Sequence, residues 1–340
     1  MKVLEACLFG VITFSGFTYG ASVSLMTYNV ENLFDTYDDP GKSDETFLPL
    51  VKKSGIEHQK KCARIHRTKW REHCLHFDWS EKVLEVKLRR IGEVIQSYQT
   101  GKGPDVLVLQ EVENQNVLSM LFKKHLEPIG FRKQVLLEGK DIRGIDVAVV
   151  SKLQLLSEPI LHTIPFKGMT RAQLEDSRGL LETRWRLPKG GVLIVLAAHF
   201  PAPFHPRKFR EQALRYINEM ALKFPKDSVI VLMGDLNIPK EEDESFHLSE
   251  ILEKQGWLWA HRVACEECRG TTYYPPKQSW SFLDRIALKT GSQWGFKTKS
   301  AHVLNLLPIQ SDTQGHPSAF FPPDTGVSDH FPLIVELEEK

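Results

Sequence analysis

One short stretch of the chain places two polar side chains at the end of an apolar run. Residues 229–233 are consecutive apolar residues, which predict a buried strand, and Gly234, Asp235 and Asn237 follow directly. Because residues two apart on a strand share a face, Asp235 and Asn237 project side by side. This carboxylate and carboxamide could bind one phosphate or orient one attacking water. The alternative is an ordinary Asx turn, since both residue types are favoured in turns.

Other apolar runs also finish in polar residues that packing does not require. They are Asn29, Glu111, His199, Asp329 and His330, while Asp284 lies within a strand and Asp146 near the start of one. For each residue the alternative role is a cap, a turn or a core hydrogen bond. Their joint occurrence at successive strand ends predicts an acidic, histidine-containing site at one rim of a sheet.

These residue types suit hydrolysis of a phosphate ester. Glu111 is a hard oxygen ligand for Mg²⁺, and the cation would neutralise charge on phosphoryl oxygens. A histidine held by a carboxylate can act as a general base or acid near neutral pH, which suits His330 with Asp284. Asp146 with His199 could form a second such pair. The sequence has no G-x-S-x-G motif, so we expect direct attack by water.

Strands and helices run through the whole chain to position these residues. Helical spacing of apolar residues predicts helices over 81–98, 118–126, 209–221 and 243–254. Apolar runs predict strands over 23–28, 105–111, 144–150, 180–187, 192–198, 229–233, 281–288 and 331–337. No repeat or low-complexity linker interrupts them, which favours one domain over residues 23–340.

The composition allows a sizeable core but provides no global electrostatic attraction. The 340 residues are 41% hydrophobic with a net charge of +1, so any basic surface must be local. Residues 1–22 are predicted to be a secretory signal peptide, with a buried N-terminal strand or helix as the alternative. No other run approaches the roughly 18 apolar residues that span a bilayer, so we expect no stable membrane insertion.

A basic, cysteine-containing segment occupies residues 50–80. It could bind a polyanion and stack bases on Trp70 and Trp79, or it could be a solvated helix face closed by a disulfide. After signal cleavage four cysteines remain, an even number that suggests disulfides in an exported chain. We expect Cys62 to pair with Cys74, while Cys265 and Cys268 form a local bridge or half of a zinc site. A zinc alternative also remains for the first pair, with three nearby histidines: His66, His73 and His76.

Seven blocks of the sequence, taken together, resemble the endonuclease/exonuclease/phosphatase superfamily, the fold of deoxyribonuclease I. G-D-x-N followed by S-D-H near the end of the chain is the specific combination, and the resemblance covers nearly all of residues 23–338. The blocks are Thr27–Glu31, Val108–Val112, Gly144–Asp146, Ala198–His199, Gly234–Asn237, Leu283–Ile286 and Ser328–His330.

The resemblance implies an α/β fold, a four-layer α/β/β/α sandwich of two mixed β-sheets packed face to face with helices outside. It implies that Asn29 and Glu111, with Asp329 beside them, form the metal site. Asp235 and Asn237 would orient the water and the scissile phosphate.

Further roles follow from the same resemblance. His330, oriented by Asp284, would be the base or phosphate contact, and His199 with Asp146 would match the second histidine and partner carboxylate of the deoxyribonuclease I branch. Arg178 and Arg143 are candidate phosphate contacts. Cys62 and Cys74 resemble an insertion found in some exported bacterial members.

The resemblance and the basic segment together predict an exported nuclease. We expect it to cleave DNA, with RNA as a second substrate, by water attack on a phosphodiester. The expected metal is Mg²⁺, with Mn²⁺ or Ca²⁺ as alternatives. A phospholipid phosphodiesterase of the sphingomyelinase type or a small-molecule phosphatase could use the same site. Phe320 and Phe321 are the one candidate for the apolar hairpin that a lipid enzyme would need. A non-enzymatic binding module would have lost catalytic residues, and here each expected position is filled. We expect a monomer without a protein partner.

Overall fold

The computed structural model describes residues 21–175, 177–322 and 326–340. Most of the predicted signal peptide therefore lies outside the described residues, and the first strand begins at Ser22. The helices are α1 (Ile56–Ala63), α2 (Thr68–His76), α3 (Glu81–Ser97), α4 (Gln115–Leu121), α5 (Arg171–Glu175), α6 (Lys208–Ala221), α7 (Lys240–Phe246), α8 (Glu250–Glu253) and α9 (Ala260–Val263).

The strands form two large sheets and one small hairpin. The first sheet has the order β13-β15-β1-β2-β4-β3, with β14 beside β15, and the second has the order β5-β6-β7-β8-β12-β9. The strands of the first sheet are β1 (Ser22–Leu33), β2 (Val106–Val112), β3 (Lys133–Leu136), β4 (Asp146–Ser151), β13 (Trp294–Phe296), β14 (His302–Val303) and β15 (Leu333–Glu339). The second sheet contains β5 (Ile160–His162), β6 (Leu180–Arg186), β7 (Val192–His199), β8 (Val229–Asp235), β9 (Trp257–Trp259) and β12 (Asp284–Lys289). The hairpin pairs β10 (Thr272–Tyr274) with β11 (Ser279–Ser281).

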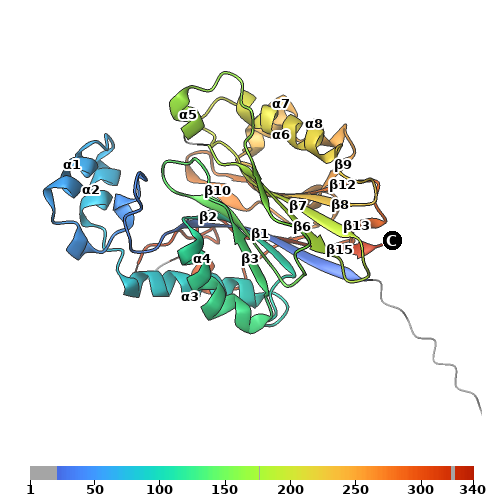
Figure 1. The fold of residues 1–340 in the computed structure, drawn as a ribbon, viewed down its shortest axis with the longest axis horizontal. Coiled ribbons are helices and arrows are strands. Elements are labelled where there is room, and N and C mark those ends of the chain that lie inside the picture. The colour runs from blue at the N-terminus through green and yellow to red at the C-terminus, as the bar shows by residue number, and fades with distance from the viewer. Residues whose placement is uncertain (1–20, 176, 323–325) are drawn as a thin grey trace, which may run out of the picture.

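Alternation along the strands produces three apolar layers. In β1, Val23 and Leu25 pack between the two sheets, whereas Met26 and Tyr28 pack against α3 and α4. A third layer lies between the second sheet and α6, where Phe209 and Ile217 are buried. Figure 1 shows α3 and α4 on one outer face and α6, α7 and α8 on the other. The molecule is thus the expected four-layer sandwich.

Each sheet is built around one parallel pair of strands. β1 pairs with β2 in parallel, and β7 pairs with β8 in parallel, while the flanking strands β15, β4, β6 and β12 run antiparallel to these pairs. A helix connects the members of each pair, α3 in one sheet and α6 in the other. The carboxyl ends of each parallel pair necessarily meet at one edge, where loops can bring polar side chains together.

The helix predicted over 243–254 is interrupted. α7 ends at Phe246, the next residue His247 has a φ of 54° in the left-handed region, and α8 begins at Glu250. Asp243 accepts hydrogen bonds from the backbone amide and hydroxyl of Ser249, and the buried Arg285 donates to Asp243 as well. These side-chain bonds compete with a continuous helical ladder, and a periodicity pattern does not register them.

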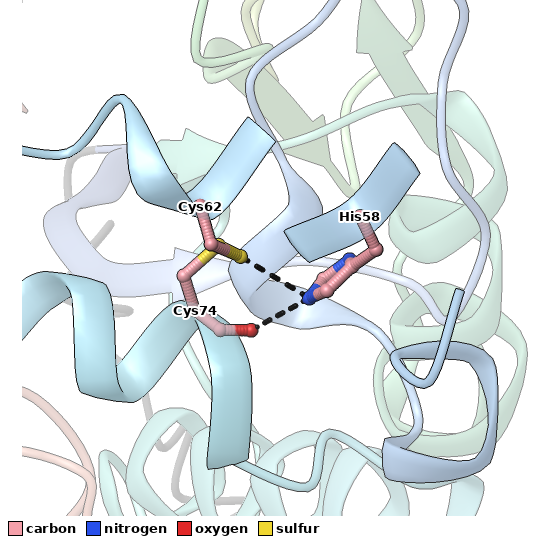
Figure 2. Close-up of side chains that lie close together, drawn as sticks. All are labelled: His58, Cys62 and Cys74. Atoms are coloured by element: carbon pink, nitrogen blue, oxygen red, sulfur yellow. Dashed lines mark hydrogen bonds between the residues drawn. A yellow bond between two sulfur atoms is a disulfide. The ribbon is translucent and has the colours of Figure 1, made fainter. Parts of the chain in front are cut away.

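The basic segment folds as a pair of helices beside the sandwich. α1 and α2 extend away from the two sheets at one side of the molecule (Figure 1), and Cys62 and Cys74 join them in a disulfide with a Cα–Cα distance of 5.6 Å. Figure 2 shows His58 Nε2 facing this bridge, 3.2 Å from Cys62 Sγ and 2.9 Å from the Cys74 carbonyl oxygen. Because both sulfur atoms are in the disulfide, they are not available as thiolate ligands for zinc.

A second disulfide joins Cys265 and Cys268, whose Cα atoms are 6.0 Å apart. It lies in the connection between α9 and β10, so the half zinc site considered for these cysteines is not formed. None of the helices in the described part of the chain combines the length and apolar character required to cross a bilayer.

Candidate active site

The carboxyl ends of the two parallel strand pairs face each other across the sandwich. The Asn29 side-chain amide, at the end of β1, donates to Asp235 Oδ2, at the end of β8, over 3.1 Å. This hydrogen bond joins the two sheets. The polar residues around it form one group, which we call the rim site: Asn29, Glu31, Glu111, His199, Asp235, Asn237, Asp284, Asp329 and His330.

Asp235 is the centre of the rim site. Its neighbours across the second sheet are His199 on β7 and Asp284 on β12. Oδ1 accepts the Asn237 backbone amide over 2.8 Å, and His199 Nε2 lies 3.5 Å from Oδ2. Burial raises the pKa of Asp235 to about 7, although the nearby His330 opposes this shift. Asp235 can therefore exchange a proton near neutral pH.

The pKa values of the two histidines of the rim site are shifted in opposite directions. His330 Nδ1 lies 2.7 Å from Asp284 Oδ2, and Asp284 is fully buried. Burial lowers the pKa of His330, but the charges of Asp284, Asp329 and Asp235 outweigh it and hold the pKa well above 6.5. Burial lowers the pKa of His199 well below 6.5, and the positive charges of Arg178 and Arg143 add to this effect. One imidazole is thus a proton donor and the other a neutral acceptor, a separation that suits acid–base chemistry.

His199 is not a satisfied core histidine. Its Nδ1 is buried without a hydrogen-bond partner among the described residues, and its side chain is nearly inaccessible. The predicted partner Asp146 forms no hydrogen bond with it: Asp146 Oδ1 accepts the Gly139 backbone amide over 2.8 Å, and Oδ2 has no partner among the described residues. Burial and the neighbouring Glu138 raise the pKa of Asp146 to about 7. The expected Asp146–His199 hydrogen bond is therefore not formed in this structure, and Asp235 is the carboxylate that lies beside His199.

Local backbone irregularity aims the side chains on the first sheet. The β1–β2 pairing shifts register between Asn29 and Leu33, and the β2–β4 pairing shifts between Gln110 and Val112. Within these irregularities Glu31 and Glu111 have φ values of 51° and 62°, and Asn237 on the other sheet has 50°. Such conformations cost about 1–3 kcal/mol each for residues other than glycine, and they cluster at functional sites. Bulges of this kind redirect side chains at strand ends.

Three carboxylates on the first-sheet side of the rim site interact electrostatically with one another. Burial and the charge of Asp329 raise the pKa of Glu31 to about 8, and Glu111 contributes in the same direction. Asp329 itself is exposed, with Oδ1 3.9 Å from His330 Nε2. Mutual repulsion among hard oxygen donors is the property expected of a site that accepts a divalent cation. Glu31, Glu111 and Asp329 are therefore the residues that could hold one.

Asn29 has a different environment from that expected of a metal ligand. Its Nδ2 donates to Asp235, and its Oδ1 accepts the Glu31 backbone amide over 3.0 Å. Ser328 also donates its hydroxyl to the Asn29 carbonyl oxygen over 2.7 Å, which fixes the S-D-H loop against β1. These bonds make Asn29 a positioning residue between the two sheets, with Glu31 as the adjacent carboxylate.

The two arginines proposed as phosphate contacts differ in availability. Arg178 is buried and pairs with Asp141 over 2.9 Å. Arg143 is 42% exposed, donates to Asn32 Oδ1 over 2.7 Å, and lies 3.9 Å from Glu111 Oε2. Burial raises the pKa of Glu111, yet Arg143, Arg178 and His330 lower it to a net value below the usual range. Arg143 is thus the better placed to meet a substrate.

Two contributors were not predicted from the sequence. Glu31 stands two residues after Asn29, the same spacing that singled out Asp235 and Asn237, and this signal could have found it. Lys87 occupies an apolar-face position of α3, next to Leu88, and is fully buried. Its Nζ donates to the Val327 carbonyl oxygen over 2.6 Å, and burial lowers its pKa to about 8 against the opposing charge of Glu31. Lys87 therefore supports the loop that carries Asp329 and His330.

Comparison with known proteins agrees with this geometry. A family model described as the endonuclease/exonuclease/phosphatase family matches residues 75–339. No curated protein matches the chain.

Solved structures share the fold at low identity. An endonuclease/exonuclease/phosphatase from Beutenbergia cavernae DSM 12333 is 15% identical with a TM-score of 0.59, covering 94% of this chain and 72% of that one. A family protein from Bacteroides thetaiotaomicron is 14% identical with a TM-score of 0.57, covering 94% and 99%. D. rerio TDP2, complexed with a single-strand DNA product, is 16% identical with a TM-score of 0.56, covering 93% and 99%. Since the family model spans most of the chain and the fold agrees, this chain belongs to the endonuclease/exonuclease/phosphatase family of hydrolases.

Proposed function

We propose that the protein is a divalent-metal-dependent nuclease that hydrolyses phosphodiester bonds of DNA. The observation that carries this proposal is the convergence on Asp235 of His199, Asp284, His330 and Asn29 from both sheets. Glu31, Glu111 and Asp329 would hold the cation, which when bound neutralises charge on phosphoryl oxygens. Mg²⁺ fits such a carboxylate set, and Mn²⁺ could replace it.

The chain's own residues divide the proton chemistry among them. Asp235, with a pKa of about 7, orients the attacking water and takes up its proton. Protonated His330, held by Asp284, donates to a phosphate oxygen, which favours the phosphate-contact role over the base role for this residue. Neutral His199 places Nε2 3.5 Å from Asp235 Oδ2, while its buried Nδ1 has no partner among the described residues. Asn237 donates its side-chain amide to the Phe200 carbonyl oxygen over 3.0 Å, which fixes the turn after β8.

A polymeric substrate is supported by the basic helix pair beside the rim site. Glu31 Oε2 accepts the Phe320 backbone amide over 2.7 Å, and the next residue, Phe321, contacts His73 on α2. α1, α2 and their connection carry exposed basic residues, and the half-exposed ring of Trp70 lies under Lys69. This surface could bind backbone phosphates beyond the scissile one and stack a base.

The lipid alternative has less support. Phe320 is partly buried, with its ring 5.8 Å from that of Trp79 and beneath the Lys87 ammonium, so of this pair only Phe321 is exposed. A single exposed phenylalanine is a small apolar surface for contact with a membrane. Cleavage of sphingomyelin remains an outcome that the activity test must include.

We also propose that the protein is exported. The two disulfides support this, because such bonds persist in oxidising compartments and are rare in the cytosol. Expression with the native N-terminus, followed by fractionation and N-terminal sequencing, tests the proposal. A full-length chain retained in the cytosol would contradict it.

Incubation of the purified protein with covalently closed plasmid, linear duplex, single-stranded DNA, RNA and sphingomyelin vesicles tests the function. We expect nicking of the plasmid with Mg²⁺ or Mn²⁺ and none after chelation. The D235N variant, shown by circular dichroism to be folded, should be inactive. Hydrolysis of sphingomyelin with all nucleic acids intact would overturn the nuclease proposal.

A further inference from the structure

A second group of carboxylates lies just beyond the ends of β1 and β2. Oxygen atoms of Asp39, Asp44 and Glu113 all lie within 4.8 Å of one another. Asp44 and Glu113 are each only 1% exposed, whereas Asp39 is partly exposed and opens the group to solvent. We call these three residues the second acidic cluster. It shares no residue with the rim site.

Each carboxylate of the cluster is fixed by a hydrogen bond through one oxygen. Asp44 Oδ2 accepts the Asp39 backbone amide over 2.8 Å, and Glu113 Oε2 accepts the Asp35 backbone amide over 2.7 Å. Asp39 Oδ2 accepts the side-chain amide of Asn114 over 3.2 Å. The side chains are thus held in place before any ligand arrives.

The other oxygens of the two buried carboxylates have no partner. Asp44 Oδ1 and Glu113 Oε1 are inaccessible to solvent and receive no hydrogen bond from the described residues. Two buried oxygens without donors, close to a third carboxylate, are costly unless a cation or protons neutralise them. This is an observation independent of the acidic composition, and it points to a ligand that accepts oxygen lone pairs.

No basic side chain in the described ranges forms an ion pair with the cluster. Lys61, the nearest candidate along the loop, pairs with Asp38 and Glu45. Lys52 donates to the Thr36 carbonyl oxygen, and Lys42 donates to that of Asp141. The described residues therefore leave the cluster open to a cation from outside the chain.

We propose that the second acidic cluster binds a divalent cation, and that this cation is Ca²⁺. Ca²⁺ accepts six to eight oxygen ligands in flexible geometry, including bidentate carboxylates and carbonyls, whereas Mg²⁺ retains several waters, for which two buried carboxylates leave little room. The cluster contains no sulfur or imidazole, which disfavours Zn²⁺.

The cation would join two segments that the substrate-binding surface depends on. Asp39 and Asp44 lie in the connection from β1 to the basic helices α1 and α2, and Glu113 lies between β2 and α4. Asn114, next to Glu113, caps α4 by accepting the backbone amides of Asn116 and Val117. Bound Ca²⁺ therefore fixes the base of the basic helix pair to the sandwich.

Calcium titration of the whole protein, with the E111Q variant used to weaken the rim site, tests the proposal. In E111Q we expect one Ca²⁺ per chain by calorimetry and a rise in Tm with Ca²⁺, since a ligand of the native state stabilises it. Adding D44N or D39N should weaken Ca²⁺ binding by at least about tenfold and abolish the rise in Tm. D227N, on an exposed acid at the opposite end of the second sheet from Asp235, is the control and should change neither.

Several outcomes would overturn the proposal. They are absence of Ca²⁺ binding in E111Q, retention of full affinity in both D44N and D39N, and a preference of this site for Mg²⁺ over Ca²⁺. Because D44N removes a buried charge, it should fold in EDTA at least as stably as E111Q alone, and partly exposed Asp39 provides a second variant. The readouts are binding and Tm, so they do not depend on nuclease activity.

Discussion

Two groups of carboxylates lie within a few residues of each other at the ends of β1 and β2, yet their surroundings differ. Glu111 of the rim site has Arg143, Arg178 and His330 close enough to lower its pKa. Glu113, two residues later, belongs to a cluster without a basic partner among the described residues, and burial raises its pKa to about 9. The first arrangement includes an exposed cationic side chain, Arg143, that can meet an anionic substrate, whereas the second consists of oxygen ligands alone.

This difference distinguishes a site suited to catalysis from a site suited to holding an ion. A site that acts on a phosphodiester needs both a cation and positive side chains, because substrate and transition state are anionic. A site that only holds an ion needs oxygen ligands and a rigid frame. This contrast supports our two proposals, hydrolysis at the rim site and the anchoring of a loop at the second acidic cluster.

The largest effect is expected from D235N. Asparagine keeps the shape but cannot take a proton, so plasmid cleavage should fall by about a thousandfold or more. Initial rates of nicking measure this, and D227N, on an exposed acid two residues before β8, is the control. Comparable rates for D235N and the wild type would remove Asp235 from the chemistry.

The next effect tests the separation of the two carboxylate groups directly. E111Q should reduce cleavage by about a hundredfold at fixed Mg²⁺. The same variant should keep the Ca²⁺-dependent rise in Tm, because that rise belongs to the second acidic cluster. Loss of both properties together would show that the two groups form one site.

A smaller effect concerns the His330–Asp284 pair and its pH dependence. Since the pKa of His330 is raised above 6.5, this pair stabilises the native state fully below pH 6.5 and loses that contribution as the pH rises through the native-state pKa. D284N should therefore lower the free energy of unfolding by about 2 kcal/mol near pH 6 and by less at alkaline pH. Denaturant unfolding in EDTA at the two pH values measures the difference, and a constant or growing deficit would contradict the assignment.

The smallest effect is expected outside both carboxylate groups. Neutralising Arg64, Arg67 and Lys69 to glutamine should weaken DNA binding by about tenfold at low salt and reduce the salt dependence by roughly one unit per lost phosphate contact. The value of kcat should not change. The matched control is K223Q with K226Q, at the opposite end of the second sheet from Asp235. Equal losses per neutralised charge in the triple and the double variant would indicate a non-specific charge effect.

Local patterns were sufficient to predict much of this fold. The helical spacing over 81–98 corresponds to α3, and the apolar runs before Glu111, His199 and Asp235 correspond to β2, β7 and β8. These predictions succeed because burial of one face imposes a period on the sequence wherever an element is long enough. The short strands β5, β9 and β13 have three residues each, too few for a period to be visible.

The residues at the strand ends can be identified from the sequence, because an apolar run followed by Gly-Asp-x-Asn or Ser-Asp-His is a feature of neighbouring residues in the chain. Tertiary structure alone decided their partners. In the folded chain, Asn29 donates a hydrogen bond to Asp235 across the two sheets, and Asp146 accepts the backbone amide of Gly139 with no hydrogen bond to His199. Asp44 lies beside Glu113 although the two residues are distant in the sequence. The physical reason is that a carboxylate's partner and pKa depend on the charges and burial around it in space, and these are set only when the two sheets pack together.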